Sequence, residues 1–333
     1  MADLALRSPQ FKHKEIPASG VLSTVCTVAI DGTLRYTLIK NVAPSTSVNF
    51  DISELARDYL EIEYKGNFHA QYVDVVTTLT NHAGLNGTAA VIGSATTFTD
   101  RGFESYGTFT ENANPPITPT YPTFLISSNG NSIDTGDITV LAPTGKGVIL
   151  PNVDIGGVLS ALILSGSTNS TIWNGVTATV KRIDCTKYGD GKKVIFINKY
   201  GAQQELWFFL KNTNSLARTN EGYKSNTITY PTDNHATYSN KNAPNKVFNT
   251  QGKRTHKLSS GFYPEFANEF FEQLLLSEYV WMEIPLREYR RNNITTPVKV
   301  KTSSMAFKTS VNDRLIEYTI DFEEAYDYIN NIR

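Results

Sequence analysis

The sequence predicts a mainly β protein made of antiparallel β-sandwich or β-barrel domains, with one long C-terminal-domain helix and a short N-terminal-domain helix. Apolar and polar residues alternate between residues 298 and 322, as in strands with one buried and one solvated face. Apolar residues between 264 and 279 recur instead at three- and four-residue spacing, the period of a helix. Asp31-Gly32 between two β-rich runs is a strong hairpin signal.

Composition limits the classes of function. The chain has 333 residues, of which 40% are hydrophobic, enough for two cores. Its 31 basic and 32 acidic residues nearly cancel, so no overall field draws it to nucleic acid or anionic lipid. We find neither the apolar stretch of a signal peptide nor the roughly 20 apolar residues of a membrane span. We therefore expect synthesis in a reducing cytoplasm, no membrane partner, and nucleic acid at most passing through a lumen.

The first half is expected to hold an N-terminal arm and one β domain. Residues 1–20 lack periodicity and contain two prolines, which predicts an arm that is disordered or ordered only by a neighbour. The domain spans 21–150, and Asp51 with Glu54 three residues later predicts a capped short helix to about Tyr59. From about 80 to 150 the chain is rich in Gly, Thr and Pro, which indicates long loops or an inserted small β domain.

The second half, 151–333, is expected to form a C-terminal β domain. Three strand-like runs between about 176 and 211 predict a meander, whose last strand, through Trp207-Phe208-Phe209, is apolar on both faces. Residues 212–250 are polar and rich in Asn and Tyr with no core pattern, so we expect an excursion out of the domain. The chain then returns into the helix predicted over 264–279, with Pro264 in its first turn.

No stretch carries a recognisable catalytic or metal-binding pattern. The five histidines show no HxH or HExxH spacing, which leaves no predicted metal site or cofactor. Gly145-Lys146-Gly147 lacks the rest of a phosphate-binding loop and predicts a tight turn between strands. The carboxylate pairs Glu323-Glu324 and Asp51-Glu54 suit helix starts as well as a glycosidase site. Cys26 and Cys185 lie in β-like contexts, and we expect two buried free thiols.

Two groups of residues are candidates for an interface. Arg287, Arg290 and Arg291 form the one local basic patch, which either grips an acidic partner or lies in a solvated loop. Loop tyrosines supply contact area at little entropic cost, although tyrosines of a β core are equally compatible with the sequence. The candidates among them are Tyr121, Tyr230 and Tyr238.

The chain resembles a known class of virion proteins in several runs. QELWFFLKNTNSLARTNEGYKSN, LLLSEYVWM and the last run, PVKVKTSSMAFKTSVNDRLIEYTIDFEEAYDYINNIR, look like tailed-bacteriophage virion structural proteins of the tail, baseplate or neck, and FDISELARDYLEI is similar to their early segment. This resemblance implies β domains that assemble into rings with copies of the chain and other virion proteins, made in the host cytoplasm, with no enzymatic activity.

Two alternatives stay open at this stage. One is a receptor- or carbohydrate-binding β-sandwich module at the tail tip, with tyrosine platforms. The other is an enzyme such as a glycan hydrolase, which needs two carboxylates across a cleft. For the ring, we expect the contacts to come from residues 1–20, 100–125 and 212–250.

Overall fold

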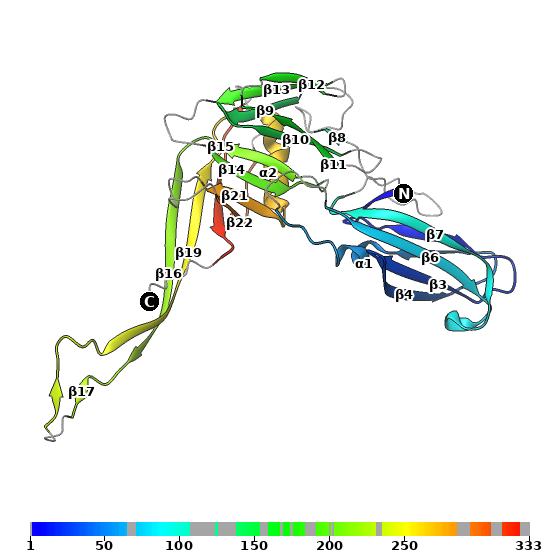
Figure 1. The fold of residues 1–333 in the computed structure, drawn as a ribbon, viewed down its shortest axis with the longest axis horizontal. Coiled ribbons are helices and arrows are strands. Elements are labelled where there is room, and N and C mark those ends of the chain that lie inside the picture. Colours follow the sequence, from blue (N-terminus) through cyan, green and yellow to red (C-terminus); the bar gives the residue numbers. More distant parts are fainter. Residues whose placement is uncertain are drawn as a thin grey trace.

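The structure is a computed structural model, and strands account for 57% of it and helices for 8%. Mainly β architecture with several antiparallel sheets is therefore confirmed. The described residues are 2–64, 71–106, 124–125, 138–153, 159–166, 169–173, 176–183, 191–199, 201, 203–230, 235–284, 294–307 and 315–326. Figure 1 shows two lobes and a long hairpin that projects from one of them. We call residues 2–106 the N-terminal lobe and residues 124–326 the C-terminal lobe.

The N-terminal lobe is built on a five-stranded sheet in the order β1-β7-β6-β3-β4, with only β1 and β7 parallel. A two-stranded sheet, β2-β5, accompanies it. Asp31 and Gly32 both have positive φ, 50° and 75°, which confirms the predicted hairpin between β3 and β4. The elements are β1 (Ala2–Ala5), β2 (Phe11–Glu15), β3 (Ser23–Ile30), β4 (Thr33–Asn41), β5 (Ser47–Asp51), α1 (Ser53–Arg57), β6 (Val73–His82), η1 (Leu85–Gly87) and β7 (Val91–Phe103).

The N-terminal segment is part of this lobe, so the predicted loose arm is wrong. β1 pairs with the end of β7, and β2 pairs with β5. A charged residue that suggested a solvated arm forms an ion pair inside the lobe. Lys12 Nζ lies 2.5 Å from Asp100 Oδ2, and both side chains are buried. An ion pair between residues so far apart in sequence leaves no local signal.

The short helix lies where it was expected, but its cap differs. Ile52, not Asp51, is the residue before the first helical turn of α1. Asp51 Oδ1 instead accepts hydrogen bonds from the backbone N–H groups of Ser53, at 3.0 Å, and Gln10, at 2.9 Å. Asp51 therefore ties the N-terminal segment to the helix start, and the predicted capping box with Glu54 does not form.

The C-terminal lobe contains a seven-stranded sheet in the order β15-β14-β21-β22-β24-β19-β16 and several smaller sheets. Its elements are β8 (Phe124–Leu125), β9 (Ile138–Pro143), β10 (Val148–Val153), β11 (Leu159–Leu164), β12 (Ser170–Trp173), β13 (Val176–Ile183), β14 (Lys192–Ile197), β15 (Gln203–Phe208), β16 (Asn212–Lys224), β17 (Ile228–Thr229), β18 (Thr237–Tyr238), β19 (Asn245–Ser259), β20 (Tyr263–Pro264), η2 (Glu265–Ala267), α2 (Asn268–Leu276), β21 (Val280–Ile284), β22 (Ile294–Val300), β23 (Leu315–Ile316) and β24 (Thr319–Glu324).

The predicted meander is only partly present. β14 and β15 form an antiparallel pair, but β13 pairs with β12 and, in parallel, with β9. The run Trp207-Phe208-Phe209 is buried throughout, as predicted. Gly145 lies in the turn between β9 and β10, which agrees with the predicted turn at that point.

The predicted long helix is shorter than expected. Pro264 keeps an extended conformation and pairs with Leu315, so the α-helix begins only at Asn268. At the other end, Ser277 leaves the helical conformation, and its hydroxyl donates to the carbonyl oxygen of Ile197 at 2.8 Å. Contacts with the sheet therefore decide both ends of α2, whereas the apolar period extends beyond them.

Each lobe has its own apolar core, and the division between them comes earlier than predicted. β7 belongs to the first sheet, although its residues fell inside the predicted insertion of 80–150. Leu141 and Ala142 of β9 already pack in the C-terminal core. Since β8 pairs with β10, the lobes divide between residues 106 and 124, not at 150. Residues 107–123 and 126–137 lie outside the described part of the chain.

Candidate interaction surface

The most prominent surface feature is the long hairpin formed by β16 and β19. The two strands pair from Asn212 opposite Leu258 to Lys224 opposite Asn245, and Figure 1 shows them running away from both lobes. At the base, β19 also pairs with β24, through residues 255–259. Among the described residues of the hairpin, Leu258 at this base packs in the C-terminal core.

An irregularity in the pairing separates the base of the hairpin from its outer part. The register shifts between Thr219 and Glu221, and Asn249 on the opposite strand has a positive φ of 49°. Such a bulge bends a strand pair and increases its twist. We call residues 220–249 the distal hairpin.

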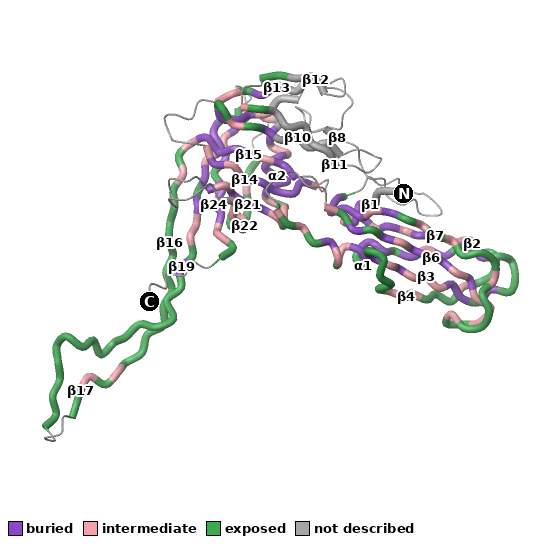
Figure 2. The backbone as a smooth tube through the Cα atoms, in the orientation of Figure 1, coloured by how far each residue is buried: buried purple, intermediate pink, exposed green. Residues whose placement is uncertain are grey.

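The distal hairpin is exposed, and Figure 2 shows it almost wholly in the colour of exposed residues. It nevertheless carries large apolar side chains. The rings of Tyr223 and Phe248 meet edge to face, with centroids 5.7 Å apart, although both are about half exposed. Large exposed apolar side chains of the distal hairpin are Tyr223, Ile228, Tyr230, Tyr238, Val247 and Phe248. Such clusters on a soluble protein mark interaction sites.

The hairpin is also basic, in a chain whose charges nearly cancel overall. Residues 212–259 contain seven lysine and arginine residues and two acidic residues, a net charge of +5 against −6 for the remaining chain. At the base the cations are neutralised, since Lys253 lies 3.6 Å from Glu323 and Arg254 lies 3.9 Å from Glu324. The outer cations, Arg218, Lys224, Lys241 and Lys246, are exposed and have no acidic partner among the described residues.

The outer edge of β16 is unpaired in the described part of the chain. β16 is the last strand of the seven-stranded sheet and has 13 residues. An exposed edge of this length offers backbone N–H and C=O groups to a strand of another chain. The hairpin thus combines a free edge, apolar side chains and positive charge.

The structure brings two of the predicted interface residues together. Tyr238 lies opposite Ile228 in the β17–β18 pair at the tip, with 74% of its side chain exposed, and Tyr230 follows β17 with 68% exposed. Both are surface residues and not core tyrosines. Tyr121, Arg287, Arg290 and Arg291 lie outside the described residues.

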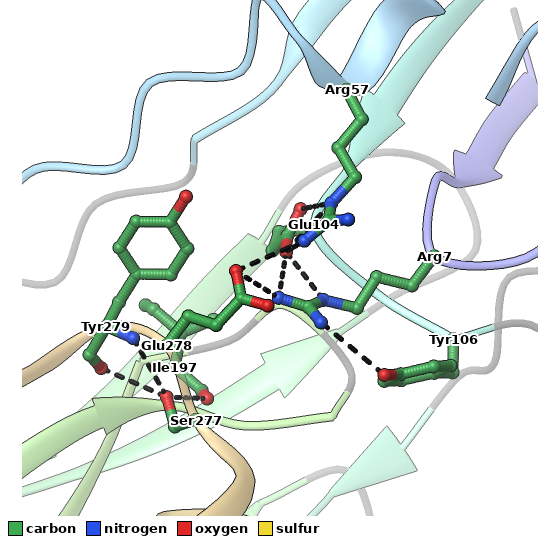
Figure 3. A network of polar contacts seen from close by, with 8 residues as sticks. All are labelled: Arg7, Arg57, Glu104, Tyr106, Ile197, Ser277, Glu278 and Tyr279. Carbon is green, nitrogen blue, oxygen red and sulfur yellow. Dashed lines mark hydrogen bonds and ion pairs between the residues drawn. The ribbon is translucent and has the colours of Figure 1, made fainter. Parts of the chain in front are cut away.

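A second surface, missed at the level of sequence, lies where the lobes meet. Glu104 is 4% exposed and binds two guanidinium groups of the N-terminal lobe, Arg7 at 2.5 Å and Arg57 at 3.1 Å (Figure 3). Glu278 of the C-terminal lobe lies 3.0 Å and 3.2 Å from the same two groups. Arg7 also donates a hydrogen bond to the hydroxyl of Tyr106. We call Arg7, Arg57, Glu104 and Glu278 the inter-lobe cluster.

The contacts within this cluster favour the charged forms of Arg7, Arg57 and Glu278. Hydrogen bonds from Arg7, together with the charges of Arg7 and Arg57, lower the pKa of Glu278. The pKa of Arg57 is raised, chiefly by its hydrogen bond to Glu104. Burial opposes the charge of Arg7, but Tyr106, Glu104 and Glu278 outweigh it and raise the pKa of the guanidinium. No local sequence pattern predicts this cluster, because its members are spread from residue 7 to residue 278.

Beside the inter-lobe cluster lies a pocket of about 220 Å³. The N-terminal lobe contributes Arg7, Glu104 and Tyr106 to its wall, and α2 with the residues after it contributes most of the remainder. We call it the inter-lobe pocket. It is below the roughly 300–1,000 Å³ of most small-molecule sites, so its size suits one or two side chains.

The described residues hold no group of three or more His, Cys, Asp or Glu side chains that could bind a metal ion. His256 is buried at the hairpin base, where its ring contacts Asn214 and Glu324. Within the same residues, no helix has the length and apolar character needed to span a membrane. Cys26 is a buried free thiol, as predicted, and Cys185 lies outside the described residues.

Comparison with protein-family models, curated proteins and solved structures found no match to this chain.

Proposed function

We propose that this chain is a non-enzymatic structural subunit of a tailed-bacteriophage virion, which assembles with its own copies into a ring of the tail, baseplate or neck. One observation carries the proposal, namely the projecting hairpin with its free edge and exposed aromatic side chains. A two-stranded ribbon without a covered apolar face is at best marginally stable in water. A neighbouring subunit that covers the distal hairpin supplies the missing contacts.

The arrangement of the lobes supports the same proposal. In the N-terminal lobe, Val48 and Phe50 of β5 share a core with strands of the five-stranded sheet, as in a β-sandwich. Two compact β lobes with a hairpin on one side present different faces, which suits the head-to-tail contacts of a ring. The resemblance of the runs at residues 204–226 and 297–333 to virion structural proteins supplies the virion context.

The test is the mass of the purified chain in solution, with and without the distal hairpin. In the shortened variant, Thr219 is joined to Gln251 by Asn-Gly, since these two residues face each other across the hairpin. We expect the full chain to form rings or larger assemblies in sedimentation and negative-stain images, and the shortened chain to be a folded monomer, lighter than the 37.0 kDa of one full chain.

Two double variants test whether assembly depends on the hairpin or on exposed apolar side chains anywhere on the surface. Tyr223→Ser with Phe248→Ser removes two half-exposed rings from the hairpin, whereas Leu34→Ser with Val91→Ser removes apolar side chains of similar exposure from the N-terminal lobe. Only the first pair should weaken assembly. A full-length chain that stays monomeric at high concentration would rule out self-assembly.

A receptor- or carbohydrate-binding module at the tail tip remains the second candidate, favoured by the exposure of Tyr230 and Tyr238. Aromatic rings at the end of a long arm suit stacking on sugars. Binding to a glycan array that is lost in Tyr230→Ala and Tyr238→Ala, in a monomeric chain, would select this function over the ring.

A further inference from the structure

The positive charge of the distal hairpin is not balanced within the hairpin itself. The distal hairpin offers Lys224, Lys241 and Lys246 without acidic partners in the described residues. Its only acidic residues are Glu221 and Asp233. The remaining chain has the opposite net charge, and the wall of the inter-lobe pocket contains four of its glutamates.

One carboxylate in the wall of the inter-lobe pocket has no cationic partner among the described residues. The wall contains four glutamates, one arginine and one lysine, and Arg57 beside it also binds Glu104 and Glu278. Arg7 binds Glu104 and Glu278, and Lys199 binds Glu269. Glu272 on α2 is exposed and has no cationic partner among the described residues. Glu272 is therefore the carboxylate of the wall that is left to meet a cation from outside.

Apolar side chains stand beside these carboxylates. Leu276, at the end of α2, is 73% exposed, and Tyr106 is 50% exposed, and both line the pocket. An exposed leucine and tyrosine around a cavity of about 220 Å³ form a receptor for one inserted aromatic or aliphatic side chain. The distal hairpin carries such side chains beside its lysines, in Tyr223 and Phe248.

The two surfaces of one molecule do not meet. Figure 1 shows the hairpin leaving the C-terminal lobe on the side away from the N-terminal lobe, whereas the pocket lies between the lobes. β16 alone, at 13 residues, spans roughly 40 Å. The hairpin therefore lies away from the pocket of its own molecule.

We propose that the distal hairpin of one copy docks on the inter-lobe pocket of the next copy. Lys246, which lies on the same face of the strand pair as Tyr223 and Phe248, meets Glu272, and one of these two rings enters the cavity. The contact is heterologous, because the hairpin and the pocket are different surfaces, so repetition closes a ring or extends a filament. This inference rests on the proposed self-assembly and names the two surfaces that make it.

Nucleic acid fits the hairpin less well than a second copy does. The four unpaired outer cations are accompanied by exposed apolar side chains such as Val247 and Phe248, and a complementary acidic, apolar surface exists on the chain itself. Phosphate groups would meet the cations but leave that acidic surface unused.

The test uses charge reversal on each surface of the full-length chain. The hairpin variant is Lys246→Glu, and the pocket variant is Glu272→Lys. Both positions are exposed, so circular dichroism and the unfolding midpoint should stay those of the wild type. Like charges across a contact cost several kcal/mol, so each variant should self-associate at least about tenfold more weakly than the wild type. Glu54→Lys, on the exposed side of α1 and outside the pocket wall, is the control and should assemble normally.

Mixing the two defective variants gives the decisive readout. The pocket variant keeps an intact hairpin, and the hairpin variant keeps an intact pocket, so one contact forms between them and growth stops. Mass photometry or sedimentation velocity should show monomers for each variant alone and a one-to-one dimer for the mixture.

Other results would overturn the inference in distinguishable ways. If the wild type assembles and the pocket variant assembles equally well, the hairpin docks elsewhere and the proposed function stands. If the hairpin variant instead loses affinity for a 40-base-pair DNA duplex while the pocket variant assembles normally, the basic surface serves nucleic acid. A wild type that never self-associates would remove the proposed function together with this inference.

Discussion

Glu104 and Glu278 contact the same two arginines in very different surroundings. Glu104 is 4% exposed, and Glu278 is 55% exposed. Water and salt screen an exposed pair, whereas a buried carboxylate depends on its cations to offset lost hydration. Glu104 therefore holds the inter-lobe cluster together, and Glu278 adds a smaller, pH-sensitive contribution.

We expect the contribution of Glu278 to disappear in acid. Arg7 and Arg57 lower its pKa below the ordinary value of 4.5. Such a carboxylate stabilises the folded state above its unfolded pKa, and the stabilisation is lost as the pH falls through the folded pKa. Urea unfolding at pH 6 should show the wild type more stable than Glu278→Gln by less than about 1 kcal/mol. The difference should shrink steadily below pH 4.5.

Glu272→Gln is the control for this pH dependence. Glu272 is exposed and has no cationic partner among the described residues, so its replacement should leave stability unchanged from pH 6 to acid. A difference between wild type and Glu278→Gln that stays constant with pH would show that the carboxylate acts through packing instead of charge.

At the level of single residues, sequence reasoning succeeded where burial follows from local pattern. Cys26 lies within an alternating strand and is buried as predicted, and burial raises the pKa of its thiol to about 11. Tyr230 and Tyr238 are exposed in a segment that shows no core period. The inter-lobe cluster could not be predicted, since Arg7 and Glu104 become neighbours only through the pairing of β1 with β7.

Among the elements, α2 depends on one side chain more than on its own helical propensity. Phe271 is fully buried, with ring centroids 6.3, 5.4 and 5.0 Å from those of Phe208, Tyr263 and Tyr318. Phe271→Ala should lower the free energy of unfolding by about 3–5 kcal/mol through lost contacts and a cavity. Urea unfolding followed by tryptophan fluorescence measures this. Leu276→Ala, at the exposed end of the same helix, should change it by less than about 0.5 kcal/mol, and equal losses would contradict the packing argument.

The sequence did not predict strands that have no buried face, because such strands lack an alternating apolar pattern. The alternation through Ile316, Tyr318, Ile320 and Phe322 was recognisable because one face of that segment is buried. β16 and the outer part of β19 are solvated on both faces, so strands that form there leave no apolar period. The ends of α2 were missed for a different reason, since contacts of Pro264 and Ser277 with distant strands decide them.

The whole molecule is joined across its two lobes by more than the inter-lobe cluster. On β1, Leu4 belongs to the N-terminal core and Ala5 to the C-terminal core, so this strand packs in both cores. Tyr64, which follows α1, packs against Trp281 of β21 with ring centroids 5.8 Å apart. The lobes therefore share apolar contacts as well as charges, and we expect them to unfold together in the wild type.

The chain contains its own probes for this coupling. Its three tryptophans, at 173, 207 and 281, all belong to C-terminal lobe segments, and Cys26 lies in the core of the N-terminal lobe. In a Cys185→Ser background, Cys26 is the only thiol, so its labelling reports the N-terminal lobe while fluorescence reports the other. Both probes should give one urea midpoint for the wild type.

Glu104→Gln should separate those two midpoints. Its loss leaves Arg7 and Arg57 facing each other with only the exposed Glu278 between them, at a cost of about 3 kcal/mol. Since both arginines belong to the N-terminal lobe, Cys26 should become reactive at lower urea than the fluorescence change. Glu54→Gln, exposed on α1, should leave the midpoints together. Coincident midpoints in Glu104→Gln would mean that the apolar contacts of Ala5 and Tyr64 suffice to couple the lobes.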